Sequence, residues 1–295
     1  MNISNSDMVA FHKCEWRWFY ERYKNLSPRG GLPIPMEVGL FGHTLMEEAF
    51  KTVMDGGSYE DVVQATGKLM IDVIGEPEKM NIYRHVLAFV SWAEEQGWKP
   101  VSIEQKGSYQ VSEEMGFGFT PDIVFEFTQG PLRGSQFIVD YKFTGQYWTD
   151  REINSSVQVP KYIAYKNKRD GTKIMRGAVV MLNTRATAKD TGPRLFLVKW
   201  VPITKKRLEH IVNENEHMME RIYDYATQDE DTLRQLLVHT TDSKQCKMCI
   251  FADDLCPTDI DGRDTTRVLK ANYVQNTHYG YNGETEGVPG EDSGK

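Results

Sequence analysis

The sequence contains no run of the roughly 18 apolar residues that a membrane-spanning helix needs. Its first residues, MNISNSDMVAFHK, lack the basic start and apolar core of a secretory signal. A cytoplasmic location without membrane contact is therefore expected. A basic excess is also missing, because 42 acidic residues outweigh 35 Lys and Arg and give a net charge of −7. This balance argues against a broad basic face for nucleic acid, so any such contact should be confined to a channel.

Cysteine is scarce and unevenly placed. Cys14 lies near the start of the chain, whereas Cys246, Cys249 and Cys256 lie close together near its end. Disulfides are not expected in a cytoplasmic protein. Cys246 and Cys249 form a C-x2-C pair, and three thiols this close together are typical of a metal site. A tetrahedral site needs a fourth ligand, and Cys14 is the remaining cysteine.

The composition, with 40% hydrophobic residues among 295, is that of a globular protein with a substantial core. Hydrophobic periodicity predicts both helices and strands. We expect an α/β fold in which a small mixed sheet is flanked by helices. Helices are expected over Asp7–Tyr23, Glu37–Met54, Tyr59–Ile74, Ile82–Gln96, Ser155–Lys168 and Thr204–Ala226, and strands over Val101–Val111, Gly177–Asn183 and Arg194–Pro202. Residues 271–295, which become Gly-rich and acidic, are expected to form a disordered tail.

The stretch from Phe119 to Thr144 predicts a β-hairpin. Two apolar, β-branched segments, Ile123–Phe127 and Phe137–Tyr141, flank a loop that contains two Gly and a Pro. Asp122 precedes the first strand. On the second strand, Asp140 and Lys142 should share one face while Tyr141 points away, because side chains alternate along a strand.

Two acids that converge at the end of an apolar hairpin repel each other unless a cation lies between them. A hard divalent ion such as Mg²⁺ suits them, since it prefers oxygen ligands and keeps waters for a substrate phosphate. For an isolated D-x-K, the alternative is an exposed Asp beside a surface Lys–Asp pair. Motifs elsewhere in the chain are needed to choose between a metal site and an exposed Asp beside a surface ion pair.

Further candidate residues lie on either side of the hairpin. His43 and Glu47 are four residues apart, so they share one face of the helix Glu37–Met54. Glu104 could add a third acid, although a surface position on a strand is the alternative. Gln158 and Tyr162 are also four apart, and their amide and phenol could hold a phosphate or stack on a base.

These segments together resemble the PD-(D/E)xK nuclease signature, and DYKFTG, GHTLMEE and Q-x-x-x-Y resemble its RecB-type branch. The resemblance implies that Asp122, Asp140, His43 and the Tyr141 carbonyl hold one or two Mg²⁺ or Mn²⁺ ions. It implies that Lys142 acts on the attacking water and that Gln158 and Tyr162 position DNA. Glu47 and Glu104 would lie in support of these ligands.

One early cysteine and a late C-x2-C-x6-C resemble the iron–sulfur members of this family, which include the AddB nuclease domain and CRISPR-associated RecB-like exonucleases. The resemblance implies a 4Fe–4S cluster held by Cys14, Cys246, Cys249 and Cys256, which would join the two ends of the chain. The final gap of six residues is slightly longer than expected. Four cysteines also suit zinc, which remains the alternative metal.

The resemblance implies one nuclease domain over residues 1–270, with its core at about residues 37–202. The expected activity is metal-dependent exonucleolytic hydrolysis of DNA, either of a single strand or from a duplex end. Recombination, repair and phage or CRISPR-related processing are the expected settings, with recombination or CRISPR adaptation proteins as partners. A non-catalytic DNA-end-binding scaffold and a zinc-stapled endonuclease are the alternatives.

Overall fold

The computed structural model describes residues 1–31, 33–186, 189–191, 194–240, 242–247 and 249–275. The chain divides into two compact units, whereas the sequence predicted one domain over residues 1–270. The larger unit contains residues 2–5 and 32–219, and the smaller unit contains residue 1, residues 6–31 and residues 220–295. Among the described residues, no helix is long and apolar enough to cross a membrane.

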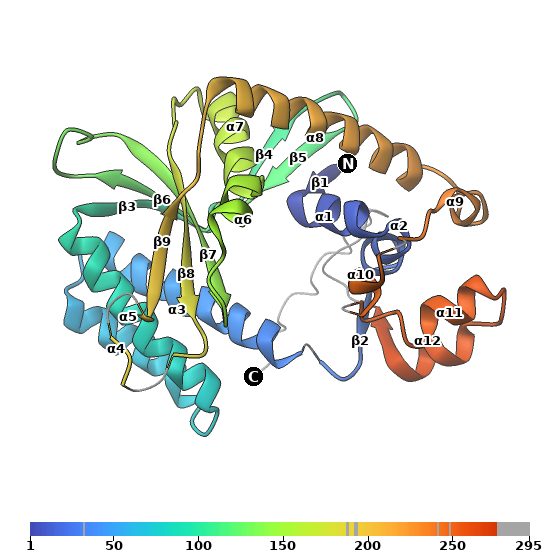
Figure 1. The fold of residues 1–295 in the computed structure, drawn as a ribbon, viewed down its shortest axis with the longest axis horizontal. Helices are drawn as coiled ribbons and strands as arrows, with labels where there is room; N and C mark the ends of the chain where they lie inside the picture. The colour runs from blue at the N-terminus through green and yellow to red at the C-terminus, as the bar shows by residue number, and fades with distance from the viewer. Residues whose placement is uncertain (32, 187–188, 192–193, 241, 248, 276–295) are drawn as a thin grey trace, which may run out of the picture. The chain divides into compact units, whose positions relative to one another are not determined.

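A five-stranded sheet forms the centre of the larger unit (Figure 1), in the order β3-β6-β7-β8-β9. Its strands are β3 (Trp98–Ile103), β6 (Ile123–Phe127), β7 (Gln136–Thr144), β8 (Gly177–Asn183) and β9 (Phe196–Trp200). Only the β7–β8 pair is parallel. The sheet is therefore mixed, and β6 and β7 form the predicted hairpin.

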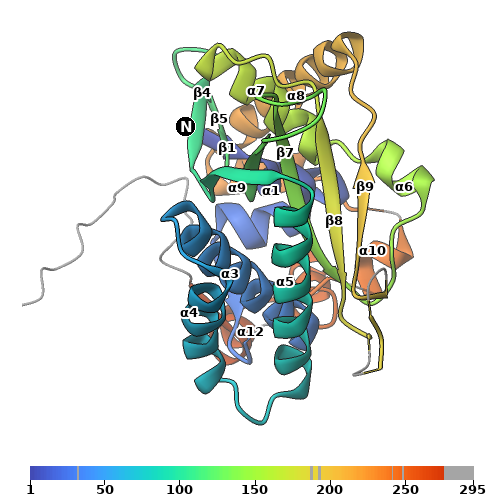
Figure 2. The ribbon, with the colours of Figure 1, turned by 90° about the vertical axis from the view of Figure 1, so that its left-hand side faces the viewer.

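Helices cover both faces of this sheet. The helices α3 (Ile34–Met54), α4 (Tyr59–Ile71) and α5 (Pro77–Glu95) lie side by side (Figure 2). Phe50 of α3 and Phe89 of α5 contact the Tyr141 ring, with which they share the main hydrophobic core. The neighbouring side chain, Lys142, contacts α7 (Gln158–Asp170), which follows α6 (Asp150–Ser155). Since adjacent residues of a strand point to opposite faces, α7 and α3 cover opposite sides.

The predicted strand Val101–Val111 is interrupted in the structure. β3 ends at Ile103, and β4 (Gly107–Gln110) belongs to a separate sheet of order β1-β5-β4, with β1 (Asn2–Ser4) and β5 (Gly116–Phe119). The break lies at Glu104, whose φ of 43° is left-handed and incompatible with a continuing strand. The prediction of one strand was therefore wrong.

The smaller unit contains the two ends of the chain. Its described elements are α1 (Asn5–Lys13), α2 (Glu15–Trp18), a π-helical turn η1 (Phe19–Tyr23), β2 (Leu26–Pro28), α9 (Glu230–Leu236), α10 (Ser243–Lys247), α11 (Leu255–Ile260), α12 (Thr266–Asn272) and β10 (Tyr273–Gln275). The long helix α8 (Lys205–Ala226) begins in the larger unit and ends in the smaller one.

Two predictions for this unit need correction. The helix expected over Asp7–Tyr23 breaks at Cys14, whose backbone is extended (φ −169°, ψ 122°). The expected tail begins later than residue 271, because β10 pairs with β2 and Tyr273 is buried. Strand pairing and burial hold these residues in place although they lack periodicity. Residues 276–295 lie outside the described part of the chain.

His85 is a buried polar group in the larger unit. Its side chain on α5 is fully buried, and neither ring nitrogen has a hydrogen-bond partner among the described residues. Burial, reinforced by the charge of Arg84, lowers the pKa of His85 to about 4. The folded protein therefore holds this imidazole neutral, whereas the unfolded chain takes up a proton near its ordinary pKa of about 6.5.

We predict that His85 makes the folded state less stable in mild acid. Between about pH 6.5 and the folded-state pKa of about 4, the unfolded state binds more protons than the folded state. Lowering the pH through this range therefore decreases the free energy of unfolding, by at most about 3 kcal/mol in total. The substitution His85→Leu should remove this loss and stabilise the protein at pH 7 by about 1–3 kcal/mol. Urea unfolding at several pH values measures both effects, and an unchanged pH profile would contradict the prediction.

Candidate active site

Three side chains from three elements meet at one end of the central sheet. His43 projects from α3, Glu104 follows β3 and Asp122 precedes β6, and one ligand atom of each lies within 4.8 Å of the others. His43 Nδ1 is 3.7 Å from Glu104 Oε1 and 3.8 Å from Asp122 Oδ2. An imidazole and two carboxylates at this spacing can hold a metal ion.

The hairpin positions Asp122 beside the second strand. The N–H of Tyr141 donates a hydrogen bond to Asp122 Oδ2 at 2.5 Å. β6 begins at Ile123, opposite Val139, so Tyr141 lies beyond the end of the strand pairing. Because the N–H and C=O of one strand residue point to the same neighbour, the Tyr141 carbonyl also faces the Asp122 side. The Tyr141 carbonyl thus points toward Asp122, as expected if both bind the same metal ion.

Asp140 is the most deeply buried acid near this group. Its side chain is 1% exposed, and its Oδ2 lies 2.7 Å from Lys142 Nζ on the same face of β7. Neither Oδ1 nor Oδ2 has a hydrogen-bond partner among the described residues, so the ion pair with Lys142 is the contact of Oδ2 and Oδ1 has none. A buried carboxylate oxygen without a partner is unfavourable. Asp140 is not one of the three side chains whose ligand atoms are grouped, although it was predicted to be a ligand. A hard divalent cation would satisfy its free oxygen, and carboxylates with an imidazole fit Mg²⁺ or Mn²⁺.

The pKa values reflect an excess of negative charge at this place. Burial, and then the charge of Asp140, raise the pKa of Asp122 to about 7 against the opposing effects of His43, Lys142 and the Tyr141 N–H. Burial lowers the pKa of Lys142, but the charges of Asp140 and Asp122 more than offset this and raise it. A buried carboxyl group whose pKa is raised by a neighbouring carboxylate is characteristic of a site that needs a cation.

The pKa of His43 responds to the same charges. Burial, the largest single effect, lowers it, but the hydrogen bond to Glu104 and the negative charges of Asp122, Glu104 and Asp140 raise it above its ordinary value. The imidazole therefore accepts a proton readily when it faces these acids alone. A metal ion would compete with that proton for Nδ1.

Gln158 and Tyr162 are linked to Lys142 through a chain of hydrogen bonds. Lys142 Nζ donates to Gln158 Oε1 at 3.0 Å, and Gln158 Nε2 donates to Tyr162 Oη at 3.0 Å. Tyr162 is 6% exposed. Both side chains project from one face of α7, as the spacing predicts, and they orient the Lys142 ammonium. Sequence reasoning did not suggest this positioning role.

The two glutamates considered for a supporting role differ in position. Glu47 Oε1 lies 2.6 Å from Lys51 Nζ, one helical turn further along α3, and is not among the grouped ligand atoms. Glu104, in contrast, is one of the three grouped side chains that could hold a metal ion. Its left-handed backbone, fixed in part by the Glu104 N–H to Asp122 C=O hydrogen bond of 3.0 Å, brings its carboxylate to His43.

Close packing between α3 and β7 sets the position of His43. A Cβ atom at Gly42 would overlap the Phe143 ring, which would then have to move, so glycine permits the observed close approach. The His43 ring then packs edge-on against Phe143, with centroids 5.4 Å apart. The imidazole is therefore held by packing as well as by its acidic neighbours.

The four cysteines surround one cavity in the smaller unit. The cavity has a volume of about 40 Å³ and is lined by Cys14, Cys246, Cys249 and Cys256 together with Tyr20, His239 and Phe251 among others. Burial, followed by the negative charges of the other three thiolates, raises the pKa of Cys256 to about 12. The extended backbone at Cys14 and the C-x2-C turn thus bring residues from both ends of the chain together.

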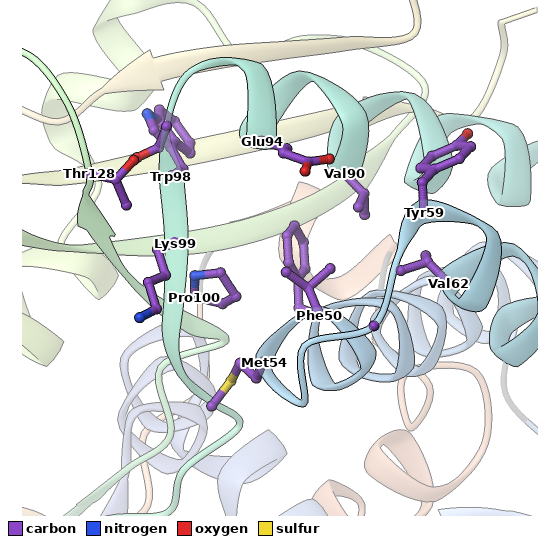
Figure 3. Close-up of a pocket in the computed structure, with 13 residues that line it drawn as sticks. Phe50, Met54, Tyr59, Val62, Val90, Glu94, Trp98, Lys99, Pro100 and Thr128 are labelled. Carbon is purple, nitrogen blue, oxygen red and sulfur yellow. The ribbon is translucent and has the colours of Figure 1, made fainter.

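A separate cavity of about 240 Å³ is lined by residues of α3, α5 and β3 (Figure 3). Its walls are mostly apolar and include Phe50, Val90 and Trp98. None of the grouped ligands His43, Glu104 and Asp122 lines it. The group of His43, Glu104 and Asp122 at the end of the sheet is therefore the candidate active site.

Comparison with known proteins identifies one family. The model of the PD-(D/E)XK nuclease superfamily matches residues 2–257. No curated protein matches the chain. A solved structure described as the crystal structure of SSO0001 aligns with a TM-score of 0.32 and 9% identity, covering 71% of this chain and 92% of that chain. That likeness is too low to support an argument.

We predict that Glu104 contributes to metal binding and that Glu47 does not. The substitution Glu104→Gln should weaken Mn²⁺ binding by at least about 10-fold, since losing even an outer partner of a metal ligand has an effect of this size. Glu47→Gln, the matched control, should bind Mn²⁺ like the wild type. Isothermal titration calorimetry distinguishes these outcomes, and wild-type affinity of the Glu104 variant would contradict the assignment.

Proposed function

The chain belongs to the PD-(D/E)XK nuclease superfamily, and we propose that it is a Mg²⁺- or Mn²⁺-dependent exonuclease that degrades DNA. Membership implies metal-dependent hydrolysis of phosphodiester bonds. The observation that carries the proposal is the unpartnered, buried Oδ1 of Asp140 beside the His43, Glu104 and Asp122 group. Recombination, repair and phage or CRISPR-related DNA processing are the settings that we propose.

The residues have separable roles in this proposal. His43, Glu104, Asp122, Asp140 and the Tyr141 carbonyl would hold one or two ions. When bound, such ions lower the pKa of a coordinated water and polarise the phosphoryl oxygen.

Lys142 would act on the reacting phosphate. Its ammonium is held between Asp140 Oδ2 at 2.7 Å and Gln158 Oε1 at 3.0 Å. It retains a third N–H bond, which can orient the attacking water or stabilise negative charge on the phosphoryl oxygens. Because Gln158 is itself bonded to Tyr162, the ammonium is positioned before the substrate arrives.

We predict that Lys142→Met abolishes most of the nuclease activity. Removal of one preorganised donor typically lowers kcat by about 10²–10³-fold. Degradation of end-labelled linear DNA with Mn²⁺ should fall accordingly, whereas Lys51→Met, which removes an exposed ammonium from α3, should leave it unchanged. Circular DNA should resist the wild type if the enzyme requires ends.

Circular dichroism would establish that both variants fold. Undiminished degradation by folded Lys142→Met would contradict the proposed mechanism. Binding of DNA ends without any cleavage by the wild type would indicate a scaffold instead.

We also propose that the four cysteines of the smaller unit bind a 4Fe–4S cluster. All four cysteines line one cavity, and four cysteine thiolates are the ligands that hold a 4Fe–4S cluster. Since its ligands come from both ends of the chain, binding would stabilise this unit.

This proposal predicts a brown protein whose colour depends on Cys14. Anaerobically purified protein should contain iron and sulfide and absorb near ~400 nm, as iron–sulfur thiolate centres do. Cys14→Ser should lose most of this absorbance and lower the melting temperature. A colourless wild-type protein that carries one zinc per chain would refute the cluster assignment without affecting the nuclease site.

A further inference from the structure

Helix α7 carries two buried lysines whose surroundings differ. Lys161 and Lys166 are each 8% exposed. Lys166 Nζ lies 2.8 Å from Asp170 Oδ2, so its charge is paired. Among the described residues, Lys161 Nζ makes one hydrogen bond, of 3.4 Å, to the neutral Asn5 Oδ1. Within the part of the chain that the structure describes, no carboxylate lies within ion-pair distance of Lys161.

An ammonium in this state is unfavourable for the folded protein. Burial of a charge destabilises the folded state unless good geometry and additional hydrogen bonds offset it. The single bond to the neutral Asn5 amide offsets little of this cost, because at 3.4 Å it is well beyond the roughly 2.7–2.9 Å of a strong ammonium–carboxylate bond. The buried lysine thus lacks the anion that its neighbour five residues later possesses.

The remaining charges around Lys161 leave it positive at neutral pH. Burial lowers the pKa of Lys161 to about 8, and the charge of Glu214 opposes this effect. Glu214 Oε1 is itself 3.3 Å from His210 Nε2. Because the pKa stays above 7, most molecules carry an ammonium that has no close anionic partner.

Lys161 lies on the same helix as the two residues that hold Lys142 of the nuclease site. It lies three residues after Gln158, about 4.5 Å along the helix axis and roughly 60° around it, and it directly precedes Tyr162. Gln158 and Tyr162 are the α7 residues that hold Lys142. A DNA strand that binds with one phosphate at Lys142 and then follows α7 would place a neighbouring phosphate near Lys161.

We propose that Lys161 binds a backbone phosphate of the DNA strand, next to the one that is hydrolysed. This inference rests on the proposed nuclease function and adds a substrate-positioning residue to it. A phosphate supplies the negative charge and the several acceptor oxygens that Asn5 lacks. Substrate binding would then relieve the unfavourable burial of the free ammonium.

The salt dependence of DNA binding tests this assignment. Binding of a fluorescein-labelled oligonucleotide would be measured by anisotropy in EDTA, so that no cleavage occurs. Each lost phosphate contact reduces the slope of log K against log[salt] by about 0.7 for a single strand or about 0.9 for a duplex. Lys161→Met should show this reduction, and Lys166→Met, equally buried on the same helix, should keep the wild-type slope.

Stability measurements separate this role from a purely structural one. Replacement of an unpaired buried charge by an apolar side chain of similar length should leave the melting temperature unchanged or raise it. A lower melting temperature with an unchanged salt slope would show that Lys161 only supports the fold. Lys161→Gln, which can still bond Asn5, provides the same test if the Met variant does not fold.

The outcomes also distinguish this inference from the proposed function. A wild-type protein that degrades DNA, combined with an unchanged slope in both Lys161 variants, would overturn the phosphate contact alone. A wild-type protein that neither binds nor degrades DNA would overturn both. A slope reduction confined to position 161 supports the contact.

Discussion

Electrostatic repulsion among carboxylates at the end of the β6–β7 hairpin is the constraint on which the larger unit depends. Asp122 and Asp140 are both almost fully buried, and Glu104 adds a third acid. Lys142 and His43 supply the opposing positive charge, yet one oxygen of Asp140 still has no hydrogen-bond partner among the described residues. Such an arrangement is poor for stability and suited to a cation. A site of this kind is consistent with the metal-dependent hydrolysis that the family match indicates.

The surrounding elements hold these charges in place before any ligand arrives. The close approach of α3 to β7 at Gly42 fixes the His43 ring, and the left-handed backbone of Glu104 redirects the chain at the end of β3. Gln158 fixes the Lys142 ammonium from the opposite face of the sheet. Each functional group is thus supported by a rigid element, which is the condition for effective preorganisation.

The two units present donors of different chemical character. The larger unit offers carboxylates and an imidazole, which suit a hard ion such as Mg²⁺ or Mn²⁺. The smaller unit offers four thiols, which suit iron–sulfur centres or zinc. This separation reduces competition for the same metal, because each donor set favours a different ion. It is consistent with a structural role for the thiols and a chemical role for the acids.

Local sequence determined the hairpin, because apolar β-branched segments bounded by turn residues predict strands directly. The bounds of β6 match the prediction, and alternation correctly placed Asp140 and Lys142 on one face. Only the tertiary structure decided that Glu104 enters the metal-ligating group while Glu47 pairs with Lys51. The physical reason is that backbone reversal at Glu104 and the choice of ion-pair partner depend on contacts between segments far apart in the chain, and these contacts leave no periodic signal in the sequence.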